Sequence, residues 1–163
     1  MHGSIIQLSR KRLGRSDLLT LNKNYEDDSA TYIAGADYIG KSYEPREKEI
    51  QYFMDWLIHE AGDDFITYDQ ESLTVTFKVG FGSRFFSKRF EELRTLVNQT
   101  TLEEFSTLGM TDYYITNLAC NPYGFQIYDD GSIMRLDEFV RYITTKYQED
   151  VTYYIGGTLD YHY

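Results

Sequence analysis

The stretch "VTYYIGGTLDYHY" (151–163) carries the strongest sequence signal about the fold. Apolar or aromatic side chains alternate with other residues over 151–155 and again over 159–163, which is the period of a β-strand. Gly156-Gly157 between the two runs permits a tight turn or a bulge. Leaving so many rings in water would invite aggregation, so we expect this stretch to be an integral strand or hairpin of the main sheet. The alternative is an edge strand that pairs with a second chain and gives a homodimer.

Further strands are expected upstream of this stretch. Residues 64–68 and 72–79 are rich in β-branched and aromatic residues, and the three residues 69–71 between them predict a β-hairpin. Along its second run Val75 and Phe77 alternate with threonines, which predicts one core face and one solvated face. Residues 3–9 also read as a short strand.

Helical spacing of apolar residues appears in three longer segments. The first follows Pro45 and ends at Gly62, with Tyr52, Trp56 and His59 on a neighbouring face that is either covered by a second layer or free to contact a partner. The other two helices are expected over about 84–98 and about 136–147. The apolar stripe that predicts the buried edge of the former consists of Phe86, Phe90, Leu93 and Val97. The expected core residues on these helices are Phe53, Met54, Leu57, Phe90, Leu93, Phe139, Val140 and Ile143.

Two shorter helices are also expected. Thr101 and Glu104 have the spacing of a capping box, which predicts a short helix over 102–108. Asp28 or Ser29 could cap another short helix that runs to Ile39. Taken together, the elements predict an α+β fold in which about three amphipathic helices pack on a mainly antiparallel sheet. We expect one globular domain over 1–163, with 10–24 as a basic surface loop.

Net charge, cysteine content and the lack of long apolar runs argue against several classes of protein. The net charge is −10, with +4 on residues 1–25 and −14 on residues 26–163, so we expect no direct binding of nucleic acid. Cys120 is the only cysteine, which argues against a disulfide-stapled secreted fold. No apolar run has the length of a signal peptide or a membrane span, so we expect a cytoplasmic protein that does not bind membranes.

Near-matches to functional motifs remain incomplete. In "YDDGSIMRLDEF" (128–139), Gly131 and Ile133 fit an EF-hand loop, but positions 1 and 3 are Gln126 and Tyr128. A turn at "DDGS" that links a strand to a helix accounts for the segment better, and no calcium binding is expected. Cys120 and the three histidines match no family signature, so we expect neither catalytic residues, nor metal, nor cofactor.

Two groups of residues are candidates for contact with a ligand or partner. The loop "GFGSRFFSKRF" (80–90) opens a helix, and it could hold an anion or a partner through Gly82, Ser83, Arg84 and Lys88, aided by Arg10 and Arg12. Against this, Lys88 could pair with Glu91 or Glu92 on its own helix. The second group, Tyr52 and Trp56, could form an aromatic contact.

The function that the sequence favours is a non-enzymatic protein-binding or regulatory module. Its acidic, Tyr-rich surface is expected to meet another protein with a basic surface. One alternative is an acidic mimic of nucleic acid that inhibits a DNA-binding protein. The other is a small domain that binds an anion or another small ligand.

Overall fold

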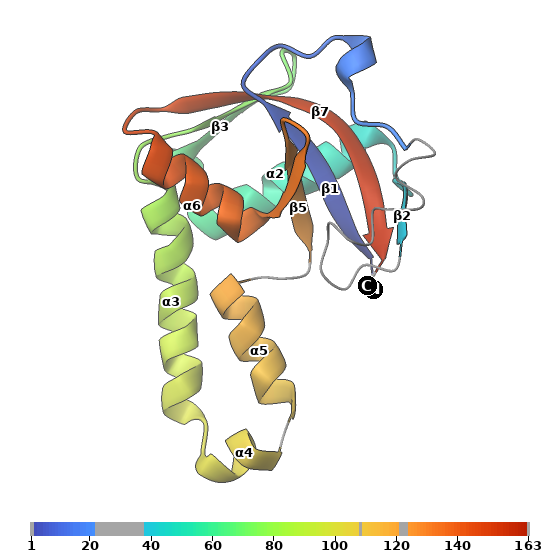
Figure 1. Ribbon diagram of the computed structural model, residues 1–163. Coiled ribbons are helices and arrows are strands. Elements are labelled where there is room, and N and C mark those ends of the chain that lie inside the picture. Colours follow the sequence, from blue (N-terminus) through green and yellow to red (C-terminus); the bar gives the residue numbers. More distant parts are fainter. Residues whose placement is uncertain (1, 22–37, 108, 121–123, 163) are drawn as a thin grey trace.

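The computed structural model describes residues 2–21, 38–107, 109–120 and 124–162. Seven strands form one sheet in the order β3-β4-β7-β1-β5-β6, with β2 paired to β7 (Figure 1). The pair β1–β5 is parallel and all other pairs are antiparallel, which confirms the expected mainly antiparallel sheet. The strands are β1 His2–Ser9, β2 Tyr38–Lys41, β3 Ile66–Asp69, β4 Thr74–Phe77, β5 Phe125–Asp129, β6 Ser132–Arg135 and β7 Val151–His162.

Strand β7 is the centre of the sheet, as the expectation of an integral strand requires. Strand β1 runs along one of its edges, whereas β4 and then β2 pair with the other edge. Between β4 and β2, the Ile155 amide donates to the Leu73 carbonyl. Since both edges are used within the chain, β7 is not the edge strand on which the suggested homodimer depends.

The pair Gly156-Gly157 forms a bulge and not a turn. Ile6 pairs with Thr158 and Leu8 pairs with Ile155, so two glycines of β7 lie opposite the single residue Gln7. This extra residue reverses the alternation of β7, because a one-residue shift turns every later side chain to the other face.

The polar groups of this bulge are held from both sides. The Gln7 Oε1 atom accepts hydrogen bonds from the amides of Leu19 (2.6 Å) and Gly157 (2.8 Å). Arg46 Nε donates to the Gly156 carbonyl at 2.6 Å. A Cβ atom on Gly157 would lie 2.1 Å from the Leu19 carbonyl oxygen, so only glycine fits there.

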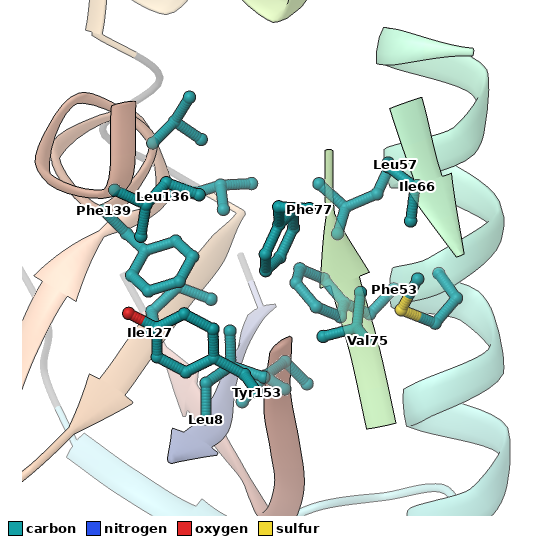
Figure 2. Close-up of a cluster of buried hydrophobic side chains, with 14 of the residues drawn as sticks. Leu8, Phe53, Leu57, Ile66, Val75, Phe77, Ile127, Leu136, Phe139 and Tyr153 are labelled. Atoms are coloured by element: carbon teal, nitrogen blue, oxygen red, sulfur yellow. The ribbon is translucent and has the colours of Figure 1, made fainter. Parts of the chain in front are cut away.

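Each face of the sheet has its own core. Helices α2 (Arg46–Ala61) and α6 (Leu136–Lys146) and the start of α3 (Phe81–Gln99) cover the larger core, to which Tyr153 of β7 belongs. Figure 2 shows Phe53 and Leu57 from α2 on one side, Leu136 and Phe139 from α6 on the other, and Phe77 between them. The smaller core on the opposite face consists of Ile5, Leu19, Ile39, Leu159 and Tyr161.

The basic stretch before β2 is only partly a surface loop. Arg10, Lys11 and Arg12 are exposed and a short 3₁₀ helix spans Arg15–Asp17, but Leu19 is buried in the smaller core. Residues 22–24 of the expected loop lie outside the described residues. A second 3₁₀ helix spans Asp63–Phe65.

Two helices do not pack on the sheet. Helix α3 continues beyond the sheet, the short helix α4 (Leu102–Thr107) lies at its far end, and α5 (Gly109–Cys120) returns beside α3 (Figure 1). We call the segment 81–120 the arm and all other described residues the body. The described residues thus form five α-helices, two more than the three expected on the sheet.

Several boundaries follow the sequence signals. Helix α2 starts after Pro45 and stops at Gly62, whose φ of 89° suits glycine. Helix α4 has the expected capping box, because the Thr101 amide donates to Glu104 Oε2 (2.8 Å) and the Glu104 amide donates to Thr101 Oγ1 (3.2 Å). None of the helices in the described ranges is long and apolar enough to cross a membrane.

Other local expectations were wrong. Tyr38 and Ile39 belong to strand β2 and not to a helix, while the rest of that expected helix lies outside the described residues. The turn at "DDGS" joins β5 to β6 in a hairpin, with positive φ at Asp130 (47°) and Gly131 (87°), and helix α6 begins only at Leu136. A two-residue turn of this kind favours a hairpin partner directly after it.

Candidate functional site

The predicted anion loop lies beside a cavity of about 250 Å³ between the start of α3 and the end of α6. Gly82 and Ser83 line this cavity, and Gly82 packs so closely that a Cβ atom would lie 1.9 Å from Thr144 Oγ1. Glu149 also lines it, and the Asp150 carboxylate accepts a hydrogen bond from the Val79 amide at 2.8 Å. Lys78 lines the cavity as well and offsets the charge of Glu149, so the lining has no net positive charge to attract an anion.

The basic residues of the prediction are not gathered at this cavity. Lys88 pairs with Glu60 of α2 at 3.0 Å, and not with Glu91 or Glu92. Arg84 is exposed, and neither residue lines the cavity.

Arg10 and Arg12 lie in the stretch after β1. The Arg10 guanidinium lies over the rings of Tyr147 (5.2 Å) and Tyr153 (5.4 Å) and donates to the Thr152 carbonyl oxygen. Arg12 is exposed. The Arg10 guanidinium therefore stacks on these two tyrosine rings and does not point into the cavity as a free cation.

The two aromatic residues predicted on α2 contact the same ring of the sheet. Tyr52 and Trp56 both contact Phe125, with ring centroids 5.6 and 5.5 Å apart. Tyr52 is 64% exposed and His59 is exposed, so the second covering layer considered for this helix face does not extend over them. Trp56 is half-buried and also contacts Phe85 at the root of the arm.

A cluster that sequence reasoning missed joins the two ends of the described chain. His2 and His162 are cross-strand partners in β1 and β7, with ring centroids 5.1 Å apart. The His2 Nδ1 atom lies 2.8 Å from Asp160 Oδ2, and the Asp160 side chain is nearly buried. Separation in sequence made these histidines look unrelated, although their matching positions in two strand-like segments were the available signal.

The neighbours of this histidine cluster are mainly aromatic. The Tyr43 ring lies 5.0 Å from the His2 ring, and the Tyr38 ring stacks on His162 at 5.5 Å. The described residues hold no group of three or more His, Cys, Asp or Glu that could bind a metal ion. The cluster therefore links the ends of β1 and β7 to β2 and the residues that follow it.

The root of the arm is built around a buried arginine. Arg89 is only 8% exposed, its guanidinium lies 5.0 Å from the Phe85 ring centroid, and it donates to the Asn117 carbonyl of α5 at 3.3 Å. Burial lowers the pKa of Arg89, although Glu60 and Asp137 act in the opposite direction. The Nε atom has no hydrogen-bond partner among the described residues.

This arginine explains why the predicted face of α3 was wrong. The sequence placed Phe86, Phe90, Leu93 and Val97 on the buried edge, but the buried residues are Phe81, Gly82, Phe85 and Arg89. Phe90 is 60% exposed and Leu93 is half-buried, whereas the other six expected core residues are buried. An arginine at a buried position weakens the apolar pattern of the true edge, so the neighbouring stripe looked stronger.

Beyond its root, the arm has no buried residue over 90–107 and 113–120, where every residue is half-buried or exposed. Helix α3 packs on α2, α5 and α6, and α5 also contacts α4, but the buried residues of α3 all lie before position 90. Helix α4 is amphipathic, with Glu103 and Glu104 beside Leu102 and Phe105, yet its two apolar side chains are 83% and 59% exposed. An apolar face without a covering layer is a candidate for contact with another protein.

Several apolar residues of the arm lie along one helix face and around one groove. Phe90 and Val97 are seven residues apart and therefore share a face of α3. Val97 also lines a groove of about 280 Å³ at the far end of the arm, together with Leu102, Phe105 and Ile115. We call Phe90, Val97, Leu102, Phe105 and Ile115 the arm strip. Its sequence signal was present in the Phe90–Val97 stripe, which was read as core.

Comparison with protein families, with curated proteins and with solved structures gave no match.

Proposed function

We propose that this protein is a protein-binding module without enzymatic activity, and that the arm strip is its contact surface. The proposal rests on one observation, which is that the far part of the arm has no buried residue over 90–107 and 113–120 although it carries large apolar side chains. A pair of helices cannot cover both of its faces alone, and a third layer supplied by another protein completes it.

The composition of the strip supports this function. Aromatic and aliphatic side chains without charge are typical of the centre of a protein interface, whereas charged residues belong to its rim. Here Glu91 and Arg94 form an ion pair beside the strip, and Glu103 flanks it on α4. In this proposal the partner contacts the arm, and the acidic body lies outside the contact.

Photo-crosslinking tests the proposal directly. A photoreactive phenylalanine analogue is placed at Phe105 of the arm and, in a separate control protein, at Tyr52 of α2, which is similarly exposed at 64%. In the cells that make this protein, we expect a discrete adduct from position 105 and none from position 52. A Phe90→Gln change in the same strip should remove that adduct, since glutamine retains the helix but not the apolar contact.

The opposite result would refute this function. Absence of any adduct from position 105, or the same adducts from both positions, would show that the strip has no specific occupant.

A further inference from the structure

We infer that the arm strip is occupied by a second copy of this chain, so that two arms pack face to face and join two molecules into a dimer. The inference rests on the proposed function, because it names the partner for the same surface. Strand β7 offers no edge for such a dimer, whereas the arm carries six of the eleven large apolar side chains that are exposed in the described residues.

The distribution of charge favours a contact between two arms. Residues 81–120 carry four basic and five acidic residues, a net charge of −1, whereas the rest of the chain carries twelve and twenty-one, a net charge of −9. Two copies that met through their bodies would bring like charges together, which is costly at an interface. Two arms meet almost without net charge and keep the acidic bodies apart.

The charges on the arm do not require opposite charges from a different partner. Arg94 is paired with Glu91 on α3, and Lys88 is paired with Glu60 of the body at 3.0 Å. Glu104 is engaged in the cap of α4. The arm therefore fits a second apolar arm better than it fits a strongly basic partner.

The exposed apolar area of the strip is about half of a standard interface. Its most exposed side chains are those of Phe90, Val97, Leu102 and Phe105, at 55% to 83% exposure. At about 150 Å² for each side chain, these four leave roughly 400 Å² uncovered. A standard interface takes about 800 Å² from each partner, of which somewhat more than half is apolar, and the groups around the strip supply the remainder.

The resulting architecture is a stable one. Each arm contributes two antiparallel helices, so two arms form four helices around one shared centre, as in a four-helix bundle. Leu93, Leu96, Ile115 and Leu118 are half-buried in the single chain and become the core of that bundle.

Sedimentation equilibrium of the purified full chain over a range of micromolar concentrations tests the inference. We expect a particle of twice the 19.2 kDa chain mass. The double variant Phe90→Gln, Phe105→Gln should sediment as a monomer with an unchanged far-UV circular dichroism spectrum. The control Tyr52→Gln replaces an equally exposed aromatic residue on α2 and should remain a dimer.

Salt provides a second readout that separates this partner from a basic one. Added salt screens the repulsion between the two acidic bodies, so the dissociation constant of the dimer should fall as salt rises. A contact between acidic and basic surfaces would respond in the opposite direction.

The outcomes distinguish the two proposals. A wild-type chain that stays monomeric at every concentration, or a dimer that the double variant leaves intact, overturns the inference. If the chain is monomeric while Phe105 crosslinks to a different protein, the proposed function stands and the second copy is excluded as its partner. An adduct of two copies supports both.

Discussion

The body and the arm use the same kinds of side chain with opposite results. Phe139 in α6 is fully buried between the sheet and neighbouring aromatic rings, whereas Phe90 in α3 is 60% exposed. The body closes on itself because β7 and its neighbours give two faces, and helices or the 10–21 stretch cover each of them. The arm has three helices, and none of its residues over 90–107 and 113–120 is buried.

This difference shows that apolar content does not decide burial. A side chain is buried only if the topology brings another element over it, and beyond its root the arm extends away from the sheet and its covering helices (Figure 1). The body therefore holds most of the buried core, and the arm is the part whose packing, as we propose, a partner completes.

Deletions in the body and in the arm should have different effects on cooperative unfolding. Removing residues 156–163 takes away the pairing of β7 with β2 and most of its pairing with β1, so we expect complete loss of cooperative thermal unfolding. Replacing residues 92–114 by a short glycine–serine linker should retain a cooperative transition, because those residues add nothing to the described core. Differential scanning calorimetry of both variants checks this, and the comparison fails if the arm deletion also abolishes the transition.

A matched pair of substitutions compares the two phenylalanines. Phe139→Ala should lower the free energy of unfolding by about 3–5 kcal/mol, the usual cost of emptying an aromatic core position. Phe90→Ala should change it by no more than about 0.5 kcal/mol in the monomer, because the ring is largely in water already. Urea unfolding at concentrations below dimer formation measures both, and equal losses would mean that the arm is packed like the body.

Alkaline pH should destabilise the body. Burial is the main cause that raises the pKa of both Tyr153 and Tyr161. Above the ordinary tyrosine pKa of about 10, the unfolded chain releases protons that the folded chain keeps. Stability is therefore fully present below that pH and falls as the pH rises, by up to about 1.4 kcal/mol per pH unit for each such tyrosine. Urea unfolding across this range should show a shallower fall for Tyr153→Phe than for the wild type.

The smallest effect is expected at the junction of the two regions. Arg89→Met removes a buried guanidinium with an unmet donor, so stability should be unchanged or rise by about 1 kcal/mol. The control Arg94→Met removes an exposed ion pair with Glu91 and should change stability by less than about 0.5 kcal/mol. A marked loss for Arg89→Met alone would show that its attraction to Glu60 and Asp137 holds the arm to the body.

Local signals in the sequence were sufficient for much of the body. Pro45 and Gly62 set the ends of α2, the three residues after Tyr68 marked the hairpin, and Gly156-Gly157 marked the bulge. These features depend on the backbone preferences of a few adjacent residues, which the sequence states directly.

The elements that were missed lack such signals or depend on distant partners. Helix α5 carries Gly109 at its start and a Tyr-Tyr-Ile run in its middle, a composition that suits strands equally well. The sequence predicted one part of the candidate site correctly. The stripe from Phe90 to Val97 was recognised as apolar, but it was expected to be buried in the core. Whether a stripe faces the sheet or the solvent depends on which other helix packs beside it, and that is not a local property.

The sequence by itself determined the class of the fold, the ends of its main helices and the strand character of 151–162, because period and turn chemistry act over a few residues. Only the tertiary structure decided that β7 lies at the centre of the sheet, that His2 meets His162, and that α3 buries Arg89 while exposing Phe90. These facts depend on contacts between residues far apart in the chain. The free energy of such contacts belongs to pairs of surfaces, and no single stretch of sequence contains both members of the pair.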